Sequence, residues 1–162
     1  MKTISGLLFA GFVALAPALP ARAQQALSVV AAENFYGDIA RQIGGDRVAV
    51  VSIMNKPDQD PHLFETTPGI VRQIADAQIA VLNGADYDPW MEKLMAAAPR
   101  PGRVTINAAA LTGKKAGGNP HLWYDPATMP AVAKALAEAF GKADPAHLAD
   151  YAARLETTLA SL

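Results

Sequence analysis

The stretch VAVVSIMNKPDQDPHLFETTPGIVRQIADAQIAVLNG (residues 48–84) contains a complete strand–helix–strand unit. Residues 48–54 and 78–83 are short apolar runs, and the first is nearly continuous, which is typical of a strand covered on both faces of a parallel sheet. Between the runs, Thr67 is suited to cap a helix and Pro68 to occupy its first position. The stretch therefore predicts a β-α-β unit, the repeating element of α/β folds.

The same alternation continues on both sides of this unit. Residues 27–32 and 104–108 are further apolar runs that predict strands. Apolar side chains at helical spacing predict one helix that ends at Gly44 and Gly45 and another that begins at Pro89. The order β-α-β-α-β-α-β implies right-handed crossovers, so we expect an α/β fold with an open parallel sheet flanked by helices.

Two more helical patterns follow the fourth predicted strand. The first carries an apolar stripe from Met129 onward, and the second begins at Asp144 and Pro145. The second stripe consists of Leu148, Tyr151, Leu155, Leu159 and Leu162. Because no stop signal precedes Leu162, we expect a long helix over residues 144–162 whose apolar face lacks its partner in this chain.

The first 23 residues have the features of a secretory signal peptide. Lys2 precedes an apolar run over residues 6–19, and a small-x-small motif ends just before Gln24. The run is shorter than the roughly 20 residues that span a bilayer. We therefore expect residues 1–23 to be removed on export and the remaining chain to be periplasmic.

Charge and cysteine content exclude several classes of function. The chain has 14 basic and 15 acidic residues; without Lys2 and Arg22 the basic count is 12, and no run of like charge occurs. This composition argues against nucleic acid and anionic membranes as partners. The chain contains no cysteine, so it must rely on a packed core rather than on disulfides, and it offers no cysteine for lipid attachment.

Two of the three histidines lie in near-identical cassettes. QDPHLF (residues 59–64) and GNPHLW (residues 118–123) share an Asp or Asn, then Pro, His, Leu and an aromatic residue. His62 follows the second predicted strand and His121 follows the fourth, so both should lie at the carboxyl edge of the sheet, where α/β folds bind ligands. The preceding prolines restrict both loops, which lowers the entropy lost when an imidazole is held in place.

The cassettes indicate a metal site, with a structural alternative. Neutral imidazole is a good ligand for zinc, copper, nickel or iron, but two imidazoles are only half of a tetrahedral shell. Alternatively, both histidines only donate hydrogen bonds to loop carbonyls. Nearby carboxylates could complete the shell or orient an imidazole, or they could cap helices or face solvent: Asp58, Asp60, Glu65 and Asp125. Glu33 and Asn34 are read as caps of the first helix, and His147 is expected to face solvent.

Common catalytic motifs are missing from the sequence. It contains no HExxH, GxSxG, Walker or GxGxxG motif. A metal bound without an evident base or nucleophile favours transport over catalysis, so we expect a protein that is not an enzyme. A periplasmic metalloenzyme and an adhesion or interaction module with structural histidines stay open as alternatives.

Several motifs, in order along the chain, resemble a known family. DPHLFETTP (60–68), ADAQIAVLNGADYDPWMEKLM (75–95) and NPHLWYDPATMPAVAKALAEAF (119–140) are similar to segments of the solute-binding proteins of bacterial ABC importers for zinc and manganese. The resemblance covers residues 28–162. That family has two α/β lobes joined by one long helix, with the metal between the lobes.

The resemblance implies roles for particular residues and partners. His62 and His121 would be the metal ligands of the first lobe, and the third and fourth ligands would come from a second lobe that this chain lacks. Zinc is expected as the transported ion and manganese next, with an inner-membrane ABC permease as partner. The implied division of the chain is a signal peptide (1–23), an α/β lobe (24–143) and the start of the connecting helix (144–162). A truncated, non-functional fragment is the remaining alternative.

Overall fold

The structure of the chain, a computed structural model, describes residues 25–61 and 64–162. The predicted signal peptide and His62 therefore lie outside the described residues. Within them, four parallel strands form one sheet in the order β2-β1-β3-β4. The strands are β1 (Leu27–Glu33), β2 (Val48–Met54), β3 (Ile79–Leu82) and β4 (Val104–Asn107). The predicted open parallel sheet is confirmed.

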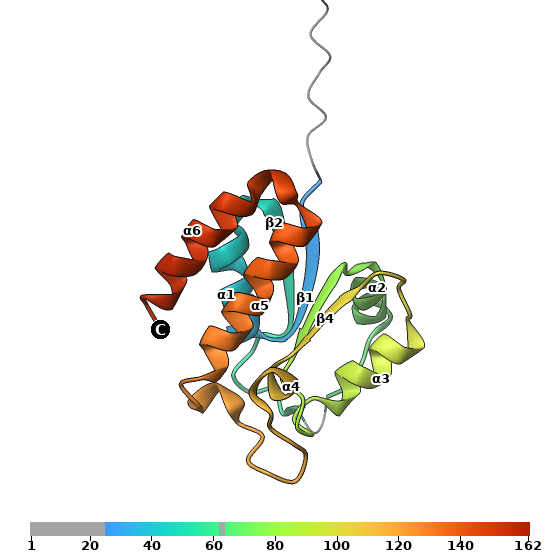
Figure 1. Cartoon of the computed structure of the whole chain (residues 1–162). Helices are drawn as coiled ribbons and strands as arrows, with labels where there is room; N and C mark the ends of the chain where they lie inside the picture. Colours follow the sequence, from blue (N-terminus) through green and yellow to red (C-terminus); the bar gives the residue numbers. More distant parts are fainter. Residues whose placement is uncertain (1–24, 62–63) are drawn as a thin grey trace, which may run out of the picture.

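Helices cover both faces of the sheet (Figure 1). One face packs against α1 (Asn34–Gly44), α5 (Thr128–Ala143) and α6 (Leu148–Leu159), and the other against α2 (Pro68–Asp76) and α3 (Pro89–Ala97). Alternation along the central strand β1 divides the core. Val29 and Ala31 belong to the α1–α5–α6 cluster, whereas Val30 and Ala32 belong to the α2–α3 cluster.

Short elements connect these layers. Those with both ends in the described residues include the 3₁₀ turns η1 (Gly45–Arg47), η3 (Leu122–Tyr124) and η4 (Pro145–His147). A short helix, α4 (Ala108–Thr112), follows β4 directly because the Asn107 side chain accepts a hydrogen bond from the Ala110 N–H at 3.0 Å. The fourth strand therefore ends one residue earlier than predicted, at Asn107.

The expectation that β2 is covered on both faces is wrong for its first half. β2 lies at the edge of the sheet, and its burial alternates between half-buried and exposed from Val48 to Val51 before becoming continuous. Val51 is 37% exposed. A run of β-branched residues therefore does not distinguish an edge strand from a central one.

The terminal helix differs from its prediction in length and packing. α6 begins at Leu148, after the 3₁₀ turn η4, and ends at Leu159. Its apolar face does have a partner: Tyr151 is fully buried, and Leu155 and Leu159 pack against the core shared with α1 and α5. The expectation that the whole stripe lacks a partner is thus wrong, although Leu148 and Leu162 are more than half exposed.

A buried carboxylate explains the start of α6. Asp144 Oδ2 accepts a hydrogen bond from the Tyr151 hydroxyl at 2.8 Å and lies 2.7 Å from His147 Nδ1. These contacts hold residues 145–147 in a tighter turn than an α-helix allows. They also overturn the expectation that His147 faces solvent, since its side chain is only 27% exposed. None of the helices in the described ranges is both long enough and apolar enough to cross a membrane.

Candidate metal centre

His121 lies in the loop between α4 and η3, at the carboxyl edge of the sheet as predicted. Asn119 Oδ1 accepts a hydrogen bond from the His121 backbone N–H at 3.0 Å and lies 2.8 Å from His121 Nδ1. An amide oxygen can only accept, so Nδ1 must carry the ring proton. In the neutral form of the ring, the other nitrogen, Nε2, then carries no proton and can bind a metal ion.

Aromatic rings surround the imidazole on one side. The ring centroids of Trp123 and Tyr87 lie 5.2 and 5.8 Å from that of His121, both in edge-on arrangements. Trp123 in turn packs against Phe35 of α1, with the ring centroids 4.6 Å apart. The His121 side chain itself is exposed. The loop is thus anchored by its aromatic residue while the imidazole stays accessible to a ligand.

The first cassette is anchored in the same way. Phe64 stacks on Trp90 of α3, with ring centroids 3.9 Å apart. Asp60, two residues before His62, lies within electrostatic range of Tyr87, whose pKa is raised by burial and then by the carboxylates of Glu33, Asp88 and Asp60. Because the Tyr87 ring also contacts His121, the beginning of the first cassette and the second cassette approach the same side chain. His62 itself lies outside the described residues.

The other predicted acids do not assemble around His121. Asp125 lies in the turn before α5, where its Oδ1 accepts a hydrogen bond from the Ala127 N–H at 3.0 Å, and its Oδ2 pairs with Lys114 at 2.9 Å. Asp58 and Glu65 are exposed. In the part of the chain that the structure describes, no three His, Asp or Glu side chains lie close enough to hold a metal ion.

A tight turn after β3 borders the site. Asp88 is buried, and its two carboxylate oxygens accept hydrogen bonds from the backbone N–H groups of Asn83 and Gly84, both at 2.8 Å. Within the turn, Gly84, Ala85 and Asp86 all have positive φ, which is unfavourable for the last two. The Asp88 carboxylate therefore holds a strained turn in place. Sequence reasoning missed this turn, although the NGADYD pattern after a buried strand carries its signal.

Glu33 is not the helix cap that the sequence suggested. Its side chain makes no capping hydrogen bond, is only 2% exposed and lies beside Asp88. Burial and then the negative charge of Asp88 raise the pKa of Glu33 well above its ordinary value. Burial also raises the pKa of Asp88, although the N–H donors of Asn83 and Gly84 oppose this shift. Protonated Glu33 can donate to the Asp88 carboxylate, so one proton shared by the two groups stabilises the pair.

This carboxyl pair predicts a pH-dependent stability. Because the folded-state pKa of Glu33 is raised, its stabilising contribution is complete below the ordinary value of 4.5 and is lost as pH rises through the folded-state pKa. In Glu33→Gln, the amide donates to Asp88 at every pH. We expect the free energy of unfolding of Glu33→Gln to exceed that of the parent by about 1–3 kcal/mol near pH 8. This is the cost of leaving one buried polar group without a hydrogen bond.

Denaturant titrations from about pH 4 to pH 8 measure the difference in free energy of unfolding between Glu33→Gln and the parent. This difference should become smaller toward about pH 4. Tyr36 and Tyr87 also face Glu33 and are present in both proteins. Because Asp88 and Glu33 shift each other's pKa, the difference between parent and variant reports the titration of the carboxyl pair. Equal pH slopes for parent and variant would contradict a raised pKa at Glu33.

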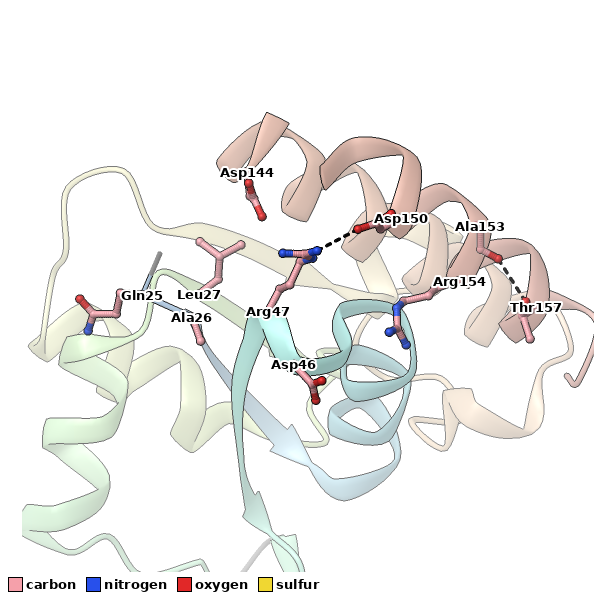
Figure 2. Close-up of a pocket in the computed structure, with 10 residues that line it drawn as sticks. All are labelled: Gln25, Ala26, Leu27, Asp46, Arg47, Asp144, Asp150, Ala153, Arg154 and Thr157. Carbon is pink, nitrogen blue, oxygen red and sulfur yellow. Dashed lines mark hydrogen bonds and ion pairs between the residues drawn. The ribbon is translucent and has the colours of Figure 1, made fainter. Parts of the chain in front are cut away.

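A pocket lies at the edge of the sheet opposite to that of His121. Figure 2 shows the residues that line it. The pocket has a volume of about 680 Å³ and lies between the beginning of β1, η1 and α6. Arg47 points toward Asp150 across it, at an N–O distance of 3.0 Å. Its charged side chains comprise two arginines and three aspartates (Arg47, Arg154, Asp46, Asp144 and Asp150). This pocket contains no predicted metal ligand.

Residues 29–162 match the protein family described as zinc-uptake complex component A periplasmic (ZnuA). The iron-binding protein YfeA of Yersinia pestis is 28% identical over 144 residues, covering 85% of this chain and 46% of that protein. The manganese ABC transporter substrate-binding lipoprotein PsaA of Streptococcus mitis is 29% identical over 134 residues, covering 75% of this chain and 43% of that protein.

A solved structure shares the fold. The manganese-bound periplasmic metal-binding protein of Candidatus Liberibacter asiaticus superimposes with a TM-score of 0.71 at 19% identity, covering 82% of this chain and 52% of that one. The chain thus spans about half the length of the curated relatives that it matches.

Proposed function

Because the chain belongs to the zinc-uptake complex component A periplasmic family, we propose that it forms the metal-capturing lobe of a solute-binding protein. In this role it binds a divalent transition metal outside the cytoplasmic membrane and presents it to an ABC permease. The family is one of solute-binding proteins, and we assign this chain transport rather than catalysis. The alternatives of a metalloenzyme and of an adhesion module have no supporting observation in the described residues.

The accessible Nε2 of His121 carries this proposal. A hydrogen bond to Asn119 Oδ1 fixes the tautomer, and the aromatic residues Tyr87 and Trp123 fix the loop, so little reorganisation is needed when a metal binds. We assign His62 the same role, because its cassette repeats the sequence pattern and its neighbour Asp60 lies near Tyr87. Asp60 would then stand where Asn119 stands in the second cassette.

Zinc is our first choice of metal and manganese our second. Two imidazoles suit zinc, whereas manganese prefers oxygen ligands, so the ligands beyond this pair decide between them. We propose that water or side chains from another part of the protein fill the remaining positions. One relative is named for iron and another for manganese, which supports a choice of ion that differs among members of the family.

Competition between protons and metal tests the proposal. An unperturbed imidazole titrates near pH 6.5, and only its neutral form binds metal. We expect the affinity of the chain for Zn²⁺, measured by isothermal titration calorimetry, to fall at least about tenfold between about pH 7.5 and about pH 5.5. An affinity that stays constant over this range would exclude histidine ligation.

A further inference from the structure

We propose that Asn83 is a positioning residue for His121, held in place by Tyr36 and acting through the backbone carbonyl of Pro120. The inference rests on the proposed function, because it concerns the same metal site. It goes further by assigning a role in metal affinity to two buried side chains that do not contact the metal.

Asn83 is fully buried at the carboxyl end of β3, and its side chain is hydrogen-bonded at both ends. Nδ2 donates to the carbonyl oxygens of Pro120 at 2.8 Å and Gly84 at 2.9 Å, and Oδ1 accepts from the Tyr36 hydroxyl at 2.8 Å. Both hydrogens of the amide and its oxygen therefore have hydrogen-bond partners. A buried amide with this many partners has a single orientation.

The contact with Pro120 joins the sheet to the loop that carries the ligand. Asn83 and Pro120 are 37 residues apart in sequence, and Pro120 immediately precedes His121. The same Pro120 carbonyl also accepts a hydrogen bond from the Leu122 N–H at 2.8 Å, on the other side of His121. Leu122 is buried. The Pro120 carbonyl group thus holds the backbone on both sides of His121. Asn83 fixes the position of this carbonyl group.

Tyr36 and Asp88 hold Asn83 in place. Tyr36, from α1, is fully buried, so the hydroxyl that orients the amide belongs to a side chain packed in the core. The Asp88 carboxylate accepts a hydrogen bond from the Asn83 backbone N–H at 2.8 Å. The position of His121 therefore depends on α1, β3 and the turn after β3. A bond to the sheet, rather than the local Asn119 contact alone, sets where the imidazole lies.

The test uses a pair of matched tyrosines. Tyr36 and Tyr151 are both fully buried, and each hydroxyl donates to a buried side-chain oxygen at 2.8 Å, Asn83 Oδ1 in one case and Asp144 Oδ2 in the other. Tyr36→Phe and Tyr151→Phe therefore each remove one buried hydrogen bond of the same length, one next to the site and one far from it. The bond lost in Tyr151→Phe has a carboxylate acceptor, so this control costs at least as much stability as Tyr36→Phe. Asn83→Ala removes the hydrogen bond to Pro120 itself and should have the larger effect on binding. If Asn83→Ala does not fold, Tyr36→Phe still tests the positioning role.

We expect Tyr36→Phe to weaken Zn²⁺ binding about tenfold and Asn83→Ala by up to about 100-fold, the range for partners that orient a ligand. Tyr151→Phe should bind like the parent. The visible absorption of bound Co²⁺, which reports ligand geometry, should change in Tyr36→Phe and not in Tyr151→Phe. Thermal unfolding of all variants separates these effects from a general loss of stability.

Measuring His121→Ala in parallel separates the proposed metal-binding function from the positioning role of Asn83. Weakened binding in His121→Ala together with parental affinity and parental Co²⁺ spectra in Tyr36→Phe would overturn the positioning role alone. Equal losses in Tyr36→Phe and Tyr151→Phe would also overturn it, because they would indicate a general effect of stability. Parental binding in His121→Ala would overturn the proposed function and this inference with it.

Discussion

His121→Ala is expected to lower the affinity of the chain for Zn²⁺ by about 100-fold or more. The substitution removes a metal ligand, and loss of even an outer partner of a ligand costs about 10–100-fold. His62→Ala should have an effect of similar size, because the two cassettes are proposed to supply equivalent ligands. Isothermal titration calorimetry near pH 7.5, where unperturbed imidazoles are neutral, measures both losses.

His147→Ala is the matched control for these two variants. Its imidazole contacts Asp144 beside the pocket at the opposite edge of the sheet, and it lies in neither cassette. We expect His147→Ala to change the unfolding temperature but not the Zn²⁺ affinity. If His147→Ala weakened binding as much as His121→Ala does, the metal would be bound at some other place.

Asp88→Ala is expected to lower the free energy of unfolding by about 3–5 kcal/mol. The substitution removes an acceptor from two buried backbone N–H groups, and hydrogen bonds to a charged acceptor contribute about 1.5–3 kcal/mol each. It also releases the turn in which Ala85 and Asp86 adopt positive φ. Urea unfolding followed by far-ultraviolet circular dichroism measures the loss.

Asp86→Asn controls for the change in charge. Asp86 lies in the same turn but is exposed, and asparagine tolerates its positive φ of 64°. We expect its unfolding free energy to stay within about 0.5 kcal/mol of the parent. Similar losses in Asp88→Ala and Asp86→Asn would mean that charge, rather than the two buried hydrogen bonds, stabilises the turn.

The fold was predictable because its signals are local. Thr67 does cap α2, accepting from the Ile70 N–H at 3.3 Å, and Pro68 does begin it. The boundaries that the sequence missed depend on contacts between elements. α6 begins late because Asp144 is engaged by both Tyr151 and His147, and no spacing rule contains that information.

Only the exposed loop of the candidate site could be predicted from the sequence. The repeated cassette indicated His121 and its loop, and the Asn119 contact lies within two residues of it. The residues beneath it were not predicted, because Asn83 reaches Pro120 across 37 positions and a buried amide leaves no periodic signal. Glu33 was read as a helix cap because a carboxylate after a strand is usually one, whereas here burial beside Asp88 decides its role.

Nitrogen-15 nuclear magnetic resonance of the histidine side chains, with and without Zn²⁺, tests whether His62 and His121 bind the metal. The chain has three histidines, so each imidazole can be assigned by single substitution. We expect Zn²⁺ to shift the Nε2 resonances of His62 and His121, to leave the Nδ1 of His121 protonated, and not to affect His147. Unchanged resonances at His62 and His121 under saturating Zn²⁺, or a shift confined to His147, would contradict metal binding by this pair.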